Sequence, residues 1–327
     1  MKKFSFLLFV VLMIGSLLTG CASTDSISNG DEGKAADGGG GDKELVIGFS
    51  QMENNNPWRI AETKSIREEA EKRGYKMVYT DAQSDTSKQV SDVEDMIAQG
   101  VDYIVLAPRE FDGLAPALES AQTAGIPVIL VDRMADGEHL TFIGSNFVKQ
   151  GQRAGEWLVE ATGGNAKIVE LTGTTGSSVA IDRQKGFMDV IDQQEGMEVI
   201  ASQTGDFARA EGQKVMENLL QSHGDDITAV YAHNDEMAIG AINAIEVAGK
   251  TPGEDITIVS VDGTKDALQS IIDGKMGATV ESSPFFGPTV FDVIEKHAGG
   301  EEIEKEIIIE DRFFDKDNAE EFVDEAY

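Results

Sequence analysis

Residues 44–131 have the sequence ELVIGFSQMENNNPWRIAETKSIREEAEKRGYKMVYTDAQSDTSKQVSDVEDMIAQGVDYIVLAPREFDGLAPALESAQTAGIPVILV, which contains the clearest evidence for the fold. Its short apolar segments predict buried strands, and apolar residues recur between them with helical spacing. The predicted strands are Leu45–Phe49, Met77–Tyr79, Tyr103–Ala107 and Pro127–Val131. The predicted helices end at glycines that suit left-handed caps, namely Gly74, Gly100 and Gly125. Three successive units of strand, helix and glycine predict a parallel sheet with helices on both faces.

The same alternation continues beyond Asn146. Predicted strands cover 166–171, 197–202, 229–232 and 256–261. Predicted helices cover 147–162, a segment around Phe187 that ends at Gly196, a segment around Val215 and Leu219, and Met237 to Gly249. Residues 44–327 exceed the usual size of one compact domain. The two runs therefore predict an α/β fold with two doubly wound parallel-sheet lobes.

The N-terminus has the features of a lipoprotein signal peptide over residues 1–21. Lys2 and Lys3 precede an apolar run, Phe6 to Ile14, and Leu18-Thr19-Gly20-Cys21 contains the only cysteine of the chain. We expect the thiol of Cys21 to be acylated, which would anchor the protein to the outer side of the cytoplasmic membrane. The alternative is an ordinary signal peptide followed by a chance cysteine. The apolar run is too short for a membrane span.

Residues 22–43 are rich in Gly, Ser, Asp and Ala, and this composition predicts a flexible linker. The whole chain has 27 basic and 59 acidic residues, a net charge of −32. Nucleic acid is an unsuitable partner for such a chain, because phosphate binding needs basic patches. The acidity is consistent with cation binding or with adaptation to salt or alkali, and equally with a solvated surface that resists aggregation.

Ligands of doubly wound folds bind beyond the carboxyl ends of the strands, so the side chains there are the candidates for a site. They are rich in planar hydrogen-bonding groups that match vicinal hydroxyls, and they include two aromatics that can cover an apolar sugar face. The candidate sugar-binding residues are Ser50, Trp58, Arg59, Asp132, Arg133, Arg183, Phe207, Asn234, Asp262 and Glu281.

Structural roles compete with binding at some of these positions. Asp132-Arg133 is also typical of a strand-end turn with a surface ion pair. Trp58 is also typical of helix-on-sheet packing, and Arg183 with Asp262 would suit an interdomain salt bridge.

Other chemistries are poorly supported by the motifs. Gly173–Ser178 resembles a phosphate-binding loop but lacks the Gly-Lys-Ser/Thr ending. The four histidines are scattered without zinc spacing: His139, His223, His233 and His297. Asp132 and Glu281 could form a glycosidase carboxylate pair, although nothing local marks either as an acid. We therefore predict no catalytic residue, no metal and no cofactor.

Several stretches carry a resemblance to a known family, in order and spacing. They are Trp58-Arg59-Ile60-Ala61-Glu62-Thr63, Ala98-Gln99-Gly100-Val101-Asp102, Asp132-Arg133, Val179 to Phe187, Gly205-Asp206-Phe207, Tyr231 to Met237, Val261-Asp262-Gly263 and Ala278-Thr279-Val280-Glu281. With them, nearly all of 44–327 resembles the type I periplasmic binding proteins. The likeness is to the ribose-type sugar-binding subunits of ABC importers, and within these to the galactofuranose-binding subgroup.

The resemblance implies roles for the candidate residues. Asp132, Arg133, Arg183, Asn234 and Asp262 would hydrogen-bond the sugar. Trp58 and Phe207 would sandwich its ring, and Arg59 and Glu281 would add polar contacts.

Departures from the ribose-binding pattern bear on the sugar. Ribose binders have two adjacent aromatics where this chain has Trp58-Arg59, a phenylalanine where it has Val261, and an amide where it has Glu281. These departures favour the galactofuranose subgroup. Residues 53–57 differ from that subgroup as well, so the identity of the sugar stays open.

The resemblance also implies two discontinuous lobes joined by three hinge crossovers near Asn146, Glu281 and Asp311. Lobe 1 would contain 44–146 and 282–310, including a returning helix from Phe286 to His297. Lobe 2 would contain 147–281 and 311–327.

We therefore predict a monomeric, extracytoplasmic lipoprotein that captures a monosaccharide, galactofuranose or a related sugar, and passes it to an ABC permease. One alternative is a sugar-sensing receptor for a membrane kinase. The other is a tethered glycosidase.

Overall fold

The computed structural model describes residues 44–327. The predicted signal peptide 1–21 with Cys21 and the predicted linker 22–43 lie outside the described residues. Among residues 44–327, no helix combines the length and the apolar character needed to cross a bilayer.

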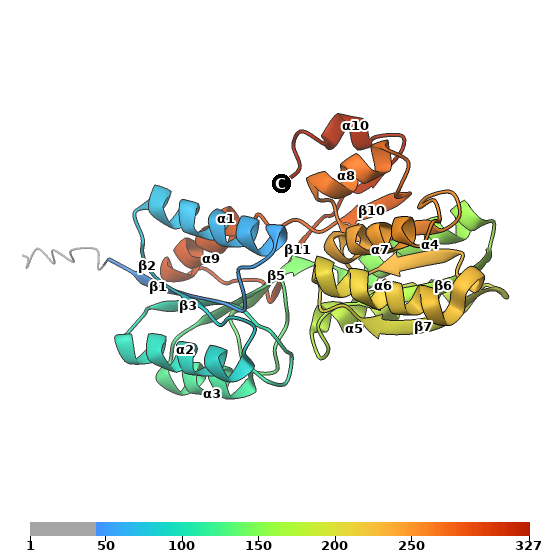
Figure 1. The fold of residues 1–327 in the computed structure, drawn as a ribbon. Helices are drawn as coiled ribbons and strands as arrows, with labels where there is room; N and C mark the ends of the chain where they lie inside the picture. The colour runs from blue at the N-terminus through green and yellow to red at the C-terminus, as the bar shows by residue number, and fades with distance from the viewer. Residues whose placement is uncertain (1–43) are drawn as a thin grey trace, which may run out of the picture. The chain divides into compact units, whose positions relative to one another are not determined.

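Lobe 1 is built on a six-stranded sheet in which every pair of neighbours is parallel, with the order β11-β5-β4-β3-β1-β2. Helices α1 and α9 cover one face of this sheet, and α2 and α3 cover the other (Figure 1). The strands are β1 (Val46–Gln51), β2 (Lys76–Asp81), β3 (Tyr103–Ala107), β4 (Val128–Val131), β5 (Thr141–Ser145) and β11 (Glu306–Ile309). The helices are α1 (Pro57–Arg73), α2 (Thr86–Gln99), α3 (Ala115–Ala124) and α9 (Gly287–Ala298).

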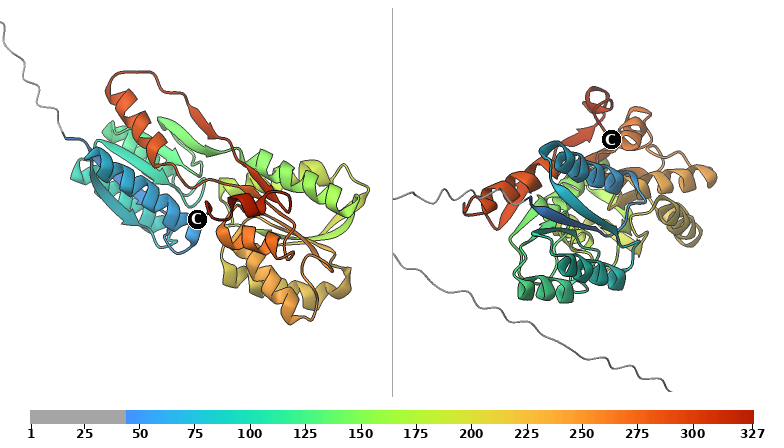
Figure 2. Two further views of the ribbon diagram at one scale, coloured as in Figure 1. Left: turned by 90° about the horizontal axis from the view of Figure 1, so that it is seen from above. Right: turned by 90° about the vertical axis from the view of Figure 1, so that its left-hand side faces the viewer.

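Lobe 2 is built on a second six-stranded sheet, with the order β12-β10-β9-β8-β6-β7, in which only β12 runs antiparallel to its neighbour. Helices α4 and α5 lie on one face, and α6, α7 and α8 lie on the other (Figure 2). The strands are β6 (Asn165–Thr172), β7 (Gly196–Thr204), β8 (Ala229–Ala232), β9 (Thr257–Asp262), β10 (Ala278–Glu281) and β12 (Phe313–Asp315). The helices are α4 (Phe147–Thr162), α5 (Ser178–Ile191), α6 (Arg209–His223), α7 (Asp235–Val247), α8 (Lys265–Ile272), α10 (Ala319–Phe322) and a 3₁₀ turn at Gly224–Asp226.

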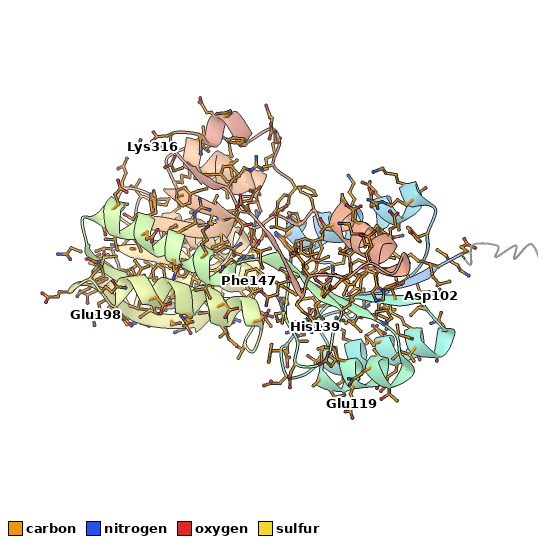
Figure 3. All side chains as sticks on the ribbon, turned by 180° about the vertical axis from the view of Figure 1, so that it is seen from behind. Asp102, Glu119, His139, Phe147, Glu198 and Lys316 are labelled. Carbon is orange, nitrogen blue, oxygen red and sulfur yellow. The ribbon has the colours of Figure 1, made fainter. Side chains whose placement is uncertain are left out.

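The chain changes sheet at three places, after β5, after β10 and between β11 and β12. Phe147, the first residue of α4, lies where the two lobes meet (Figure 3). Each central strand is buried on both faces, which explains why these strands have nearly continuous apolar sequences. The predicted fold of two doubly wound lobes is confirmed.

The predicted helix ends of lobe 1 are confirmed. Gly74, Gly100 and Gly125 have φ angles of 79°, 74° and 70°, and their N–H groups bond to the last carbonyls of α1, α2 and α3. At the start of α1, Asn56 Oδ1 accepts a hydrogen bond from the N–H of Arg59 at 2.9 Å, and Pro57 occupies the first turn. This cap fixes the place where Trp58 and Arg59 leave the backbone.

Other boundaries differ from the prediction. Helix α5 ends at Ile191 and not at Gly196, because a tight turn follows in which the N–H groups of Gln193 and Gln194 bond to Val190 and Ile191. Gly196 instead begins β7. No strand was predicted for β5, β10, β11 or β12, and no helix for α8. Polar residues or glycine interrupt the apolar runs of β5 and β10, and β11 and β12 are edge strands.

Helices α4 and α5 approach each other through two glycines. A Cβ at Gly151 would lie 2.1 Å from the carbonyl oxygen of Arg183, and one at Gly186 would lie 1.9 Å from that of Val148. Backbone therefore contacts backbone at this crossing. The close approach sets the position of Arg183 relative to α4.

We predict that Gly151→Ala destabilises the protein by about 1–3 kcal/mol, because the helices must separate to admit the methyl group. The matched control is Gly155→Ala, one turn along α4, where the new Cβ would first meet side-chain atoms of Val190 at 3.1 Å. Alanine's higher helix propensity should offset most of that cost. Urea denaturation of both variants measures the difference, and equal stability would contradict it.

Candidate functional site

A cavity lies between the two lobes, at the carboxyl ends of their strands. Six of its lining residues come from lobe 1 and five from lobe 2. They are Glu53, Asn56, Trp58, Arg59, Asp132 and Arg133, and Val179, Arg183, Phe207, Asn234 and Asp262. Polar side chains and two aromatic rings line it from both lobes, which is the kind of lining that small polar ligands need.

The lobe 1 wall contains a chain of buried charges. Arg59 Nη2 lies 2.5 Å from Asp132 Oδ2, and Arg59 Nη1 lies 2.8 Å from Glu62 Oε2. Burial raises the pKa of Glu62, and the positive charge of Arg59 opposes this shift only in part. Burial lowers the pKa of Arg59, but the charges of Asp132 and Glu62 outweigh that effect and hold it above its usual value.

Arg133 is the second buried arginine of this wall, and it has fewer hydrogen-bond partners than Arg59. Its Nη1 donates to the carbonyl of Arg109 at 2.8 Å, whereas its buried Nε has no hydrogen-bond partner. Burial and the nearby charge of Arg59 lower the pKa of Arg133 to about 9. A ligand oxygen that accepts a hydrogen bond would complete this site, because an unpartnered buried donor is costly.

The lobe 2 wall is organised around Arg183. Its Nε donates to Gln150 Oε1 at 2.9 Å, its Nη1 donates to the carbonyl of His233, and its Nη2 lies 3.7 Å from Asp262 Oδ1. Burial raises the pKa of Asp262 well above its usual value, and the charge of Arg183 opposes this shift. Asn234 Oδ1 caps α7, and its Nδ2 donates to the carbonyl of Phe207 at 3.1 Å.

Two aromatic rings line the cavity from opposite lobes. Trp58 Nε1 donates to the carbonyl of Ser282 at 2.7 Å, and the indole packs edge-on against Phe286. The ring of Phe207 lies against Gly173, where a Cβ would be 1.9 Å from it. Both rings are thereby fixed in place, and each is only 7% exposed. They can cover the C–H faces of a ligand with little loss of conformational freedom.

Backbone strain accompanies these side chains. Asp132, Phe207 and Asp262 have φ angles of 61°, 59° and 139°, in a region that residues other than glycine seldom adopt. Such strain persists only where the surrounding structure over-determines the backbone, and it is typical of functional sites.

Eight of the ten predicted site residues line this one cavity, and Ser50 and Glu281 do not. Ser50 is fully buried in β1, and its Oγ has no hydrogen-bond partner. The carboxylate of Glu281 instead pairs with Arg312, with Oε1 at 2.7 Å from Nη2. The structure therefore does not bring Asp132 and Glu281 together as a glycosidase pair.

Two structural alternatives are wrong. Asp132 and Arg133 are 4% and 3% exposed, so they do not form a surface ion pair. Arg183 and Asp262 both belong to lobe 2, so their contact is not interdomain. The packing role of Trp58 is present together with its place in the cavity wall.

Three residues line the cavity that were not among the predicted site residues, Glu53, Asn56 and Val179. Glu53 and Asn56 lie in the loop between β1 and α1, and Val179 lies in the first turn of α5. All three lie close in sequence to residues that were predicted as candidates because they follow strands. Including the neighbours of those candidates in sequence would have identified them.

The family described as periplasmic binding protein domain matches residues 47–302. This chain belongs to the periplasmic binding protein family. The match, together with the relatives below, confirms the predicted resemblance to the ribose and galactofuranose subgroup of type I members.

This periplasmic binding protein is 42% identical over 270 residues to the ribose import binding protein RbsB of Bacillus subtilis (strain 168), covering 82% of this chain and 86% of that protein. It is 40% identical over 260 residues to the galactofuranose-binding protein YtfQ of Escherichia coli (strain K12), covering 77% and 82%. Both relatives are named as binding proteins, and this chain is a binding protein and not an enzyme.

A solved structure shares the fold. It is the periplasmic binding protein component of the arabinose ABC transporter from Shewanella sp. ANA-3, bound to alpha and beta-L-arabinofuranose. The TM-score is 0.83 and the identity 40%, over 86% of this chain and 95% of that one.

Gln150 connects the cavity to the three crossovers of this binding protein. Its Oε1 holds Arg183, and its Nε2 donates to Asp311 Oδ2 at 2.8 Å and to the carbonyl of Glu281 at 3.2 Å. The other carboxylate oxygen of Asp311 accepts from Ser145 Oγ at 2.8 Å. Burial raises the pKa of Asp311 to about 6, although these hydrogen bonds act in the opposite direction.

We predict that the free energy of unfolding of the wild type rises relative to that of Asp311→Asn as the pH falls from 7 to 4. The proton binds folded Asp311 with a pKa of about 6 and unfolded aspartate with one of about 3.9. The folded state is therefore favoured as pH falls through this window, and the advantage is lost as pH rises through 6.

The full difference is at most about 3 kcal/mol. Urea denaturation at several pH values measures it, and Asp317→Asn, on an exposed side chain nearby, serves as the control. Parallel pH profiles for wild type and Asp311→Asn would contradict the prediction.

Proposed function

We propose that this protein is the substrate-binding component of an ABC sugar importer and that it captures a monosaccharide in the cavity between its lobes. The observation that carries the proposal is the convergence of two aromatic rings and five hydrogen-bonding side chains, from both lobes, on one cavity. Trp58 and Phe207 would cover the faces of the ring. Asp132, Arg133, Arg183, Asn234 and Asp262 would bond its hydroxyls, and Arg59 would hold Asp132 in place.

Binding would act on a hinge between lobe 1 (44–146 and 282–310) and lobe 2 (147–281 and 311–327). The lobes already touch beside the cavity, where the N–H of Phe111 lies 3.0 Å from the carbonyl of Gly176. The N–H of Met134 lies 3.0 Å from Ser178 Oγ. A sugar that contacts both lobes favours this closed arrangement, because only a difference in contacts between states shifts their equilibrium.

A furanose is the ligand class that we favour. A galactofuranose-binding relative and a structure bound to arabinofuranose both support it, at 40% identity each. The pair Trp58-Arg59 also departs from the two adjacent aromatics of ribose binders. The permease, as the acceptor of the closed protein, would recognise both lobes at once, and the binding protein itself would act as a monomer.

We predict that at least one sugar of a panel of L-arabinose, D-galactose, D-fructose and D-ribose raises the melting temperature. A ligand at 100 times its dissociation constant adds about 2.7 kcal/mol to stability. Asp132→Asn should bind at least about tenfold more weakly, because a hydrogen bond to a charged group contributes about 1.5–3 kcal/mol.

The matched control is Glu281→Gln, which makes the same change outside the cavity and should keep the shift. Differential scanning fluorimetry and titration calorimetry measure both. No shift with any sugar would refute the proposed function, and unchanged affinity in Asp132→Asn would remove Asp132 from the site.

We further propose that residues 1–21 direct export and that Cys21 carries the lipid anchor on the outer side of the membrane. Cys21→Ser should release the protein into the medium or leave it unprocessed, because no thiol remains to be acylated. Cell fractionation with immunoblotting measures this, and Ser23→Ala is a neighbouring control. Unchanged membrane retention of processed protein would count against lipidation.

A further inference from the structure

Three guanidinium groups line the cavity, those of Arg59, Arg133 and Arg183. Buried arginines bind carboxylates well, because their planar donors match both carboxylate oxygens. Two lining carboxylates, Asp132 and Asp262, lie next to these cations. The two carboxylates do not balance the three arginines. A further negative charge in the cavity wall would therefore disfavour a sugar acid relative to a neutral sugar.

Glu53 supplies that charge. It lines the cavity and is only 8% exposed. Its carboxylate accepts hydrogen bonds from Asn55 Nδ2 at 3.3 Å, from Asn56 Nδ2 at 3.4 Å and from Ser84 Oγ. All of these donors are neutral side chains. The negative charge of Glu53 therefore acts on the cavity, where it opposes the lowering of the pKa of Arg133 by burial and Arg59.

The backbone beyond β2 is strained where it holds this carboxylate. Gln83 and Ser84 have φ angles of 54° and 61°, although neither is glycine. The N–H of Ser84 also bonds to the carbonyl of Met52 at 2.9 Å, next to Glu53. Two consecutive left-handed residues have an energetic cost, and such strain is typical of places where a functional group must be positioned.

We propose that Glu53 is a specificity-determining residue that favours neutral sugars and rejects sugars carrying a carboxylate. Its oxygens accept hydrogen bonds from ligand hydroxyls, and its charge repels a ligand carboxylate that the three arginines would otherwise attract. Rejecting a competitor through like-charge repulsion is a general route to specificity. The inference rests on the proposed function, since it assumes that a sugar occupies this cavity.

The test compares wild type with Glu53→Gln, which keeps the shape and removes one negative charge. The probes are matched pairs: D-galactose with D-galacturonate, D-glucose with D-glucuronate, and D-ribose with D-riburonate. Titration calorimetry measures each affinity at low salt. We expect Glu53→Gln to bind the neutral sugar about tenfold more weakly and the matching acid at least about tenfold more tightly, because hydroxyl acceptance weakens and repulsion disappears.

Glu68→Gln is the matched control. Glu68 is largely exposed on α1, so this variant makes the same change in net charge away from the cavity. Its ratio of acid to neutral affinity should equal that of the wild type. An equal change in both variants would assign the effect to overall charge and overturn the proposal.

Ser84→Ala keeps the test decisive if Glu53→Gln does not fold. It retains the carboxylate but removes the hydroxyl that holds it, and discrimination should fall in the same direction. If the wild type binds neutral sugars and these variants leave the ratio unchanged, the role of Glu53 is refuted while the proposed function stands. If the wild type binds neither class, the proposed function itself fails.

Discussion

The cavity depends on one buried ion pair, in which Arg59 Nη2 lies 2.5 Å from Asp132 Oδ2. The pair joins the first turn of α1 to the residue that follows β4. Desolvating two charges costs several kcal/mol per ion, and removing one partner would cost about 3–5 kcal/mol because the other stays buried and unpaired. Hydrogen bonds to Glu62 and Gln51 offset part of this cost. Gln51 Nε2 donates to Glu62 Oε2, which also accepts from Arg59. Buried hydrogen bonds thus connect the charged groups of the lobe 1 wall to one another.

Lobe 2 also places a buried arginine in the cavity wall, but a partner of this arginine contacts residues at the crossovers between the lobes. Arg183 is held by Gln150, by the carbonyl of His233 and by Asp262, all within its own lobe. Gln150 also contacts Asp311 and Glu281, which adjoin two of the three crossovers, and Ser145 reaches Asp311 from the third. A movement of the lobes that disturbs these contacts therefore changes the support of a side chain in the cavity wall. The hydrogen bonds from Arg183 to Gln150 and from Gln150 to Asp311 therefore connect the cavity wall to the hinge.

Much of the site could be predicted because parallel strands bring their carboxyl ends to one edge of each sheet. Asp132 and Asp262, far apart in the chain, both follow or end a strand, and both line the cavity. The same rule also selected Ser50 and Glu281, which do not line the cavity in this structure, because it gives the end of a strand but not the direction of its side chain. Ser50 is fully buried in β1, and Glu281 pairs with Arg312. No strand was predicted for β5 because Gly144 and Ser145 end its apolar run, and none for β12 because it is a three-residue edge strand.

The alternation of strands and helices, the glycine caps and the chemical character of the cavity could be predicted from the chain alone, because they follow from local spacing and residue type. Which polar side chains face one another became evident only in the folded protein. Glu53 became part of the cavity through a loop held by Ser84, and Arg183 became linked to the crossovers through Gln150. These pairings join segments that are distant in the chain, and their geometry is set by the packing of whole lobes. No local pattern encodes that packing.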